Sequence, residues 1–234
     1  MIKIKNLIWY GVLAFGFLGL QPMYGQKINQ FDSNKQRTGV WKKYYKNNRI
    51  LYEGQFKNGK EVGTFKFYDI SSSNHPIIIK KFRQSSDSVF TQFYTTKGVF
   101  QSQGYFIGRK RVGKWIYFFP TKKKMSEENY KDGLLDGMVI NYYPNGKITE
   151  KTRYKKGVKH GQSFQFTSDG DILEEVNYEN GKLNGPAKYY DIKGQLKEQG
   201  TYKNGKRVGQ WEYYLDGEVV TKKKKSTYKK QNKE

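Results

Sequence analysis

Aromatic and polar positions recur along most of this chain with a fixed period. A glycine precedes each aromatic cluster, and successive glycines are separated by 24, 50, 24, 24, 24 and 24 residues: Gly39, Gly63, Gly113, Gly137, Gly161, Gly185 and Gly209. We assign Ser88 to the equivalent position in the long interval, which divides it into two intervals of 25 residues. A constant period of this length predicts an array of eight structural repeats.

Each repeat is expected to form two β-strands. The first strand follows the glycine and carries aromatic residues, such as Trp115 and Tyr117, and the second contains an aromatic seven residues before the next glycine in six of the eight units. Turn pairs such as Asn145-Gly146 and Asn180-Gly181 follow the first and second strands. Asn-Gly and Asp-Gly supply the two positive φ angles of a type I′ hairpin. We therefore expect antiparallel strands of about seven residues and no helix after residue 26.

A single hairpin is marginally stable in water, so neighbouring units must stack side by side. The sequence thus predicts an all-β protein, an elongated single-sheet antiparallel meander of about eight 24-residue hairpins, roughly 75 Å long. Terminal segments differ from the repeats, and residues 27–38 show no proper hairpin pattern. The expected organisation is a signal peptide (1–25), an N-terminal cap (26–38), the repeat array (39–221) and a Lys-rich tail (222–234).

Aromatic side chains dominate the apolar content, with 20 Tyr and 15 Phe in a chain that is only 35% hydrophobic. Rings at equivalent positions of stacked hairpins are expected to form a ladder along one face of the sheet. This ladder is the predicted core, and most rings are assigned to packing, but it is also the candidate binding surface. The candidate contact residues are Trp41, Tyr45, Phe65, Trp115, Tyr117, Tyr189, Trp211 and Tyr213.

The chain is strongly basic, with 44 Lys and Arg against 21 Asp and Glu and a net charge of +23. Such a charge favours anionic partners, although it also serves solubility. A run of lysines follows the last repeat, and two interpretations of it stay open: it protects an exposed sheet edge, or it captures an acidic surface. These residues are Lys222, Lys223, Lys224 and Lys225.

The N-terminus has the pattern of a secretory signal. Lys3 and Lys5 precede an apolar stretch at residues 7–20, which is followed by a small residue, Gly25. The apolar run is shorter than the roughly 20 residues that a membrane span needs. We expect export with cleavage between Gly25 and Gln26, and an uncleaved anchor is the alternative.

No catalytic or metal-binding pattern stands out. The chain has two His and no Cys, and neither His lies at a telling distance in the sequence from a metal ligand or a nucleophile. Glu150, Glu174 and Glu198 recur one repeat apart, and we expect them to pair with lysines on neighbouring strands. We therefore expect a non-enzymatic protein without a metal site or cofactor.

The repeat resembles the bacterial variant of the MORN repeat. Residues 52–60 read Tyr-Glu-Gly-Gln-Phe-Lys-Asn-Gly-Lys and are followed by Gly63, and residues 198–206 with Gly209 are similar. The resemblance covers about residues 39–220, and it departs from the pattern where the first glycine is replaced by Glu128, Thr152 and Val176. It implies an elongated antiparallel sheet that mediates protein or membrane contacts, and some relatives are described as antitoxin-like.

Three functions are compatible with these features. The first is an interaction or scaffold module of the cell envelope or exterior, which binds an unknown protein or an anionic envelope polymer through an aromatic and basic face of the sheet. The second is a charge-driven binder of an anionic membrane surface, a glycan or, less favoured, nucleic acid. The third is an antitoxin-like inhibitor. Residues 69–102 depart most from the repeat and are the first place to look for a specific contact. The partner and the oligomeric state stay open.

Overall fold

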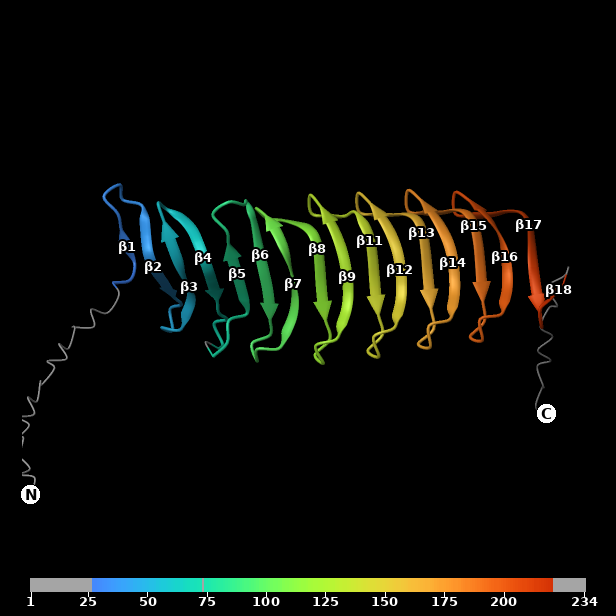
Figure 1. The fold of residues 1–234 in the computed structure, drawn as a ribbon, viewed down its shortest axis with the longest axis horizontal. Helices are drawn as coiled ribbons and strands as arrows, with labels where there is room; N and C mark the ends of the chain where they lie inside the picture. Colours follow the sequence, from blue (N-terminus) through green and yellow to red (C-terminus); the bar gives the residue numbers. More distant parts are fainter. Residues whose placement is uncertain (1–26, 73, 221–234) are drawn as a thin grey trace, which may run out of the picture.

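The computed structural model describes residues 27–72 and 74–220, which form one open antiparallel sheet of 18 strands (Figure 1). These residues contain no helix. The predicted all-β, single-sheet meander is therefore confirmed. The signal peptide, its cleavage site at Gly25 and Gln26, and the tail lysines Lys222–Lys225 lie outside the described residues.

The strands follow one another across the sheet in chain order, and β1 and β18 lie at opposite ends (Figure 1). The first strands of the eight hairpins are β2 (Arg37–Tyr44), β4 (Lys60–Phe67), β6 (Ser88–Tyr94), β8 (Lys110–Phe118), β10 (Leu134–Leu135) with β11 (Gly137–Tyr142), β13 (Val158–Phe166), β15 (Lys182–Tyr190) and β17 (Lys206–Leu215). The second strands are β3 (Ile50–Lys57), β5 (Ile78–Phe82), β7 (Phe100–Ile107), β9 (Lys124–Lys131), β12 (Ile148–Lys155), β14 (Ile172–Glu179), β16 (Leu196–Lys203) and β18 (Glu218–Val220). A short β1 (Gln30–Phe31) precedes them.

Two kinds of turn alternate along the sheet, and only one is the predicted type I′ turn. Asn180 and Gly181, which join two hairpins, both have positive φ (49° and 81°). In Asn145-Gly146, by contrast, only the glycine has positive φ, at 95°. There the Gly146 amide donates to the Tyr143 carbonyl, so that a type I turn is followed by one left-handed residue. The prediction of type I′ geometry is therefore wrong at Asn145-Gly146 and Asp169-Gly170, but it is confirmed at Asp216-Gly217, where φ is 51° and 83°. Because the turns use few residues, most strands have eight or nine residues rather than seven.

Lys122 occupies the left-handed position of one such three-residue loop, with φ of 65°. A side chain with a Cβ is strained there, whereas glycine is not. We expect Lys122→Gly to raise the free energy of unfolding by about 0.5–1 kcal/mol. Thr121→Gly, one residue earlier and without positive φ, is the matched control and should lower it. Urea unfolding followed by circular dichroism measures both, and equal effects would contradict the assignment.

The irregular unit is in register with the others, but one residue later than we inferred. Gly39 pairs with Phe56, Gly113 with Tyr130, and Val89 stands at the same place opposite Phe106. Val89, not Ser88, is therefore the equivalent of the glycine. Phe82 lies seven residues before Val89, so this unit also carries the second-strand aromatic.

The N-terminal cap contains a short hairpin, contrary to expectation. Gln30 pairs with Thr38 and Phe31 with Arg37. The Asp32 side chain accepts hydrogen bonds from the amides of Asn34 and Gln36, which closes the turn. The hydrophobic pattern missed this element because a two-residue strand is too short to show alternation.

Nearly all the buried side chains lie on one side of the sheet, here called the packed face, which carries Trp41, Phe65, Trp115 and Trp211. Phe65 and Trp115 are fully buried because each ring lies on the backbone of a glycine in the preceding strand. A Cβ at Gly104 would stand 2.3 Å from the Trp115 indole, and one at Gly54 would stand 2.4 Å from the Phe65 ring. The first glycine of the repeat motif thus leaves the space in which the aromatic ring 11 residues later packs.

Units that lack this glycine also lack the large ring. Thr152 faces Ser163 across β12 and β13, and Val176 faces Ala187 across β14 and β15. All four are at most 1% exposed. Glycine with an aromatic, or a medium residue with a small one, therefore fills the same space, and the departures from the repeat pattern are compensated. The predicted continuous ladder is consequently interrupted through the units at residues 139–187.

Candidate functional site

The candidate contact residues identified from sequence are mostly core residues. All except Tyr45 project from the packed face, and Phe65 and Trp115 have no exposed surface. The Tyr45 hydroxyl donates to the Tyr68 carbonyl at 2.9 Å and ties two turns together. Phe65 and Trp115 are therefore removed from the contact set. Part of the surface remains accessible at Trp41, Tyr45, Tyr117, Tyr189, Trp211 and Tyr213.

Arginine side chains stack on the solvent side of some rings of the packed face. Arg111 lies 4.9 Å from the Trp115 ring centroid, and Arg207 lies 3.9 Å from that of Trp211. Cation–π contacts of this kind contribute about 0.5–2 kcal/mol each. The guanidinium groups thus serve the packing of the rings and are engaged within the chain.

The recurring glutamates on the packed face are only partly paired. Glu150 meets Lys159 at 3.0 Å, as expected, and Glu198 meets an arginine, Arg207, at 2.8 Å. Glu174 has no such partner among the described residues, because Leu183 occupies the position that Lys159 and Arg207 hold in the neighbouring repeats. Burial raises the pKa of Glu174. The pairing prediction therefore holds for two of the three glutamates, one of them with Arg in place of Lys.

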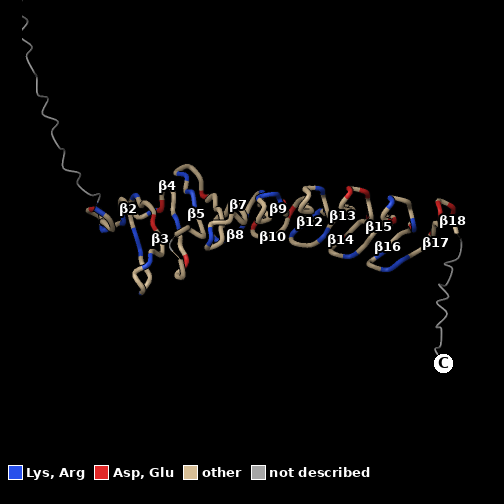
Figure 2. Tube along the Cα trace, turned by 90° about the horizontal axis from the view of Figure 1, so that it is seen from below, with Lys and Arg blue, Asp and Glu red and all other residues tan. Residues whose placement is uncertain are grey.

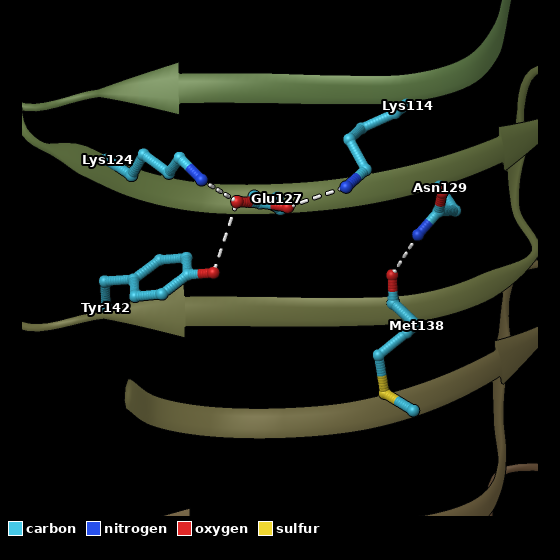
Figure 3. A network of polar contacts seen from close by, with 6 residues as sticks. All are labelled: Lys114, Lys124, Glu127, Asn129, Met138 and Tyr142. Carbon is cyan, nitrogen blue, oxygen red and sulfur yellow. Dashed lines mark hydrogen bonds and ion pairs between the residues drawn. The ribbon is translucent and has the colours of Figure 1, made fainter. Parts of the chain in front are cut away.

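The opposite side of the sheet, the reverse face, carries its own network of ion pairs. Glu127 accepts from the Lys114 ammonium at 2.9 Å, from the Lys124 ammonium, and from the Tyr142 hydroxyl at 3.3 Å (Figure 3). Beside it, the Asn129 amide donates to the Met138 carbonyl at 2.6 Å and ties β9 to β11. The Lys124 contact above all lowers the pKa of Glu127 to about 2, against the cost of burial.

A row of aromatic residues on the reverse face was missed by the sequence reading. The residue five positions after each glycine, or after Val89, is aromatic in all eight units. Three of the tyrosines donate to a glutamate on this face: Tyr68 to Glu53, Tyr142 to Glu127 and Tyr214 to Glu212. Burial raises the pKa of Tyr68 to about 12. The row is Tyr44, Tyr68, Tyr94, Phe118, Tyr142, Phe166, Tyr190 and Tyr214.

Uncompensated positive charge gathers on one long edge of the sheet, the edge at which the type I′ turns and their equivalents lie (upper edge in Figure 1). Counted with the strand residue on either side of each turn, the seven turns that join successive hairpins at this basic edge hold eleven cations and three acids, whereas the eight turns of the opposite edge hold eight cations and six acids. All eleven are exposed, and none forms a salt bridge within the described residues. They are Lys57, Lys60, Arg83, Arg109, Lys110, Lys131, Lys155, Lys156, Lys182, Lys203 and Lys206.

The sequence contained the signal for this edge, because the lysines flank the turn glycines at each repeat. The sequence predicts a basic face of the sheet, but many of the strand cations, such as Lys114, Lys159 and Arg207, form ion pairs with glutamates. Figure 2 shows Lys and Arg distributed along the whole length of the array. With a strand spacing of about 4.8 Å, equivalent turns lie about 10 Å apart, and the seven turns span roughly 60 Å.

The irregular unit, in which we expected a specific contact, forms an open recess at the basic edge. Phe56, Phe82 and Val89 line it from the strands, and Arg83 and Asp87 line it from the longer loop. No three acidic or His side chains gather as a metal site in the described part of the chain. None of the described residues forms a helix that is long and apolar enough to cross a bilayer.

The fold defines a linear β-repeat protein whose surfaces are made by recurring side chains rather than by a cleft. The repeats match the family described as the MORN repeat variant at residues 37–58, 111–132, 135–156, 159–180 and 183–204. The chain is a MORN-variant repeat protein, and repeats of this family are in general modules for interaction with proteins or membranes.

Other comparisons add little. No curated protein matches the sequence. One solved structure, a mutant of S. aureus TarM in complex with fondaparinux, α-GlcNAc-glycerol and UDP, is similar at 14% identity with a TM-score of 0.24. The match covers 56% of this chain and 20% of that one. A similarity this low supports no argument about fold or function.

Proposed function

We propose that this protein is an exported, non-enzymatic scaffold that binds an extended anionic partner along the basic edge. The observation that carries the proposal is the row of eleven exposed cations without salt bridges. The partner class is an acidic polymer of the cell envelope or the acidic surface of another protein. Export is supported by the signal-like N-terminus, and the absence of catalysis by the lack of any acid–base or nucleophile set in the sequence.

The edge suits this role better than either face. On the faces, many of the cations, such as Lys114, Lys159 and Arg111, are held by glutamates or rings, so that a ligand there would have to displace existing contacts. At the edge, the cationic groups are exposed and form no salt bridge with other described residues, and each contributes about 1 kcal/mol near an anionic surface. A spacing of about 10 Å lets one extended polyanion meet several turns at once.

A charge-reversal experiment tests the edge directly. The triple variant Lys155→Glu/Lys156→Glu/Lys182→Glu removes three cations from two neighbouring type I′ turns. We expect it to weaken binding to an acidic polysaccharide or to anionic vesicles at least about tenfold, with a reduced dependence on salt. Binding is measured by co-sedimentation between 50 mM and 200 mM salt, the range over which counterion release has its effect.

The matched control makes the same change in net charge on the opposite edge, with Lys122→Glu/Lys123→Glu/Lys147→Glu. This variant should lose much less affinity. If both triple variants bind equally weakly, net charge rather than the basic edge determines binding, and the proposal fails. Deletion of residues 222–234 separates the tail from the edge: a loss of binding confined to this deletion would assign the anion site to the tail. No described residue bears on the antitoxin-like role.

A further inference from the structure

The C-terminal end of the sheet presents an open strand edge. β17 pairs with β16 along its inner side, but β18 covers only Tyr213, Tyr214 and Leu215 on its outer side. Within the described residues, the outer backbone groups of residues 206–212 therefore have no neighbouring strand. Such an edge is a template for pairing with another chain.

Trp211 on this strand is incompletely packed. Its counterpart Trp115, inside the array, is fully buried and lies 6.4 Å from the Tyr130 ring of the following strand. In the part of the chain that the structure describes, Trp211 has aromatic contacts only with Tyr189 and Tyr202 from preceding strands, and it is partly exposed.

The Trp211 indole nitrogen, although buried, also has no hydrogen-bond partner among residues 27–72 and 74–220. At the other end of the sheet, the Trp41 indole donates to the carbonyls of Thr38 and of Gln30, and Gln30 belongs to β1, the strand outside β2. β1 precedes β2 in the sheet, and the Trp115 indole likewise donates to the Tyr105 carbonyl of the preceding strand β7, at 3.1 Å. The missing acceptor therefore does not itself indicate a strand outside β17, and what such a strand would supply is the cover that Tyr130 gives Trp115.

The edge strand is complementary to itself. Residues 206–212 read Lys-Arg-Val-Gly-Gln-Trp-Glu, and antiparallel pairing with a second copy centred on Gly209 brings opposite partners together. Lys206 then lies opposite Glu212 of the other copy, Arg207 opposite Trp211, and Val208 opposite Gln210. Opposite charges and cation–ring pairs directly across two strands are stabilising.

We propose that two copies of this chain pair through β17 into a symmetric dimer with one continuous sheet. The left-handed backbone at Gly209 (φ 67°) allows the glycine and the residues after it to pair, because Gly39 and Gly113 have similar φ and each begins the pairing with its following strand. At the other end of the sheet β2 is not open to head-to-tail pairing, because β1 covers its first residues and the Asn29 amide donates to the Val40 carbonyl. The competing occupant is the chain's own segment after Val220.

A charge swap tests the dimer. Sedimentation of the purified full chain should show a dimer, and Lys206→Glu should weaken dimerisation at least about tenfold because two like-charge pairs replace two ion pairs. The double variant Lys206→Glu/Glu212→Lys restores complementary charges and should recover the dimer. Lys182→Glu, at the same place in the preceding repeat, is the control and should leave dimerisation unchanged.

Cross-linking tests the register, and the chain has no native cysteine to interfere. A mixture of Val208→Cys and Gln210→Cys proteins should form a mixed disulfide faster than either protein alone, because directly opposed Cβ atoms lie about 4.5–5.5 Å apart. A mixture of Val208→Cys with Glu212→Cys, which are not opposed, is the control.

Several outcomes would overturn the proposal. The first is a monomeric chain at every concentration. A second is a dimer that forms only when residues 222–234 are deleted, which would show that the chain's own segment occupies the edge. Growth into filaments would indicate head-to-tail contact instead. Failure of the charge swap to restore the dimer, with both variants folded by circular dichroism, would exclude the register centred on Gly209.

Discussion

Replacing Gly104 with valine is expected to lower the free energy of unfolding by about 3 kcal/mol. The new Cβ would stand 2.3 Å from the Trp115 indole, which is fully buried and cannot retreat into solvent. Gly104 does not have a positive φ, so the backbone accepts valine and the effect isolates the clash with the ring. Trp115→Ala alone should cost about 3–5 kcal/mol because it leaves a cavity.

The double variant Gly104→Val/Trp115→Ala recreates the pair found at Val176 and Ala187. It should be more stable than the sum of the two single effects predicts, with a coupling of at least about 2 kcal/mol. Urea unfolding followed by far-UV circular dichroism measures the four proteins. Gly108→Ala, where a Cβ would contact nothing, is the control for backbone strain alone. If the effects of the two single substitutions on the free energy of unfolding simply add in the double variant, Gly104 and the Trp115 ring are not coupled and the proposed packing is wrong.

The second large effect is a dependence of stability on pH through Glu127. Its side chain is only 10% exposed and is held by Lys114 and Lys124. The Lys124 contact lowers its pKa from 4.5 to about 2. A carboxyl whose pKa is depressed on folding stabilises the protein above its unfolded pKa, and this stability is lost as the pH falls through the folded value.

We therefore expect Glu127→Gln to lower the free energy of unfolding at pH 7 by no more than about 3 kcal/mol. The difference from the unsubstituted protein should shrink between pH 4.5 and about 2, and vanish below that. Glu175→Gln, two repeats later at the same position, is the control, because Glu175 has no salt bridge in the described part of the chain. Its cost at pH 7 should be clearly smaller. A Glu127→Gln effect that is constant from pH 7 to pH 2 would contradict the assigned pKa.

The fold was predictable because the sequence of each repeat specifies its own local structure. Glycine spacing, turn pairs and ring positions specify a hairpin of about 24 residues, and a hairpin can be stable only beside another one. The turn geometry was predicted only in part. Asn180-Gly181 and Asn145-Gly146 look alike in sequence, but a type I turn at Asn145-Gly146 leaves positive φ to the glycine alone.

The candidate site was less predictable. Trp115 and Tyr44 are both aromatic and both follow a repeat glycine, yet Trp115 is fully buried and Tyr44 is 49% exposed. Trp115 lies on the packed face against Gly104 of the preceding strand, whereas Tyr44 lies on the reverse face. Which face a ring occupies and which residue it meets are set by the register of the sheet. The positive charge likewise concentrated at the turns, because the strand cations found glutamates and rings as neighbours.

The sequence by itself determined the period, the strand order and the absence of a second layer, since these follow from contacts between residues that are close along the chain. Only the tertiary structure decided which rings are core, which charges are free and which strand edge is uncovered. These properties depend on side chains that are brought together across strands. Two residues with the same local sequence pattern can therefore differ in burial or pairing, because the residue on the neighbouring strand is different or because no neighbouring strand is present.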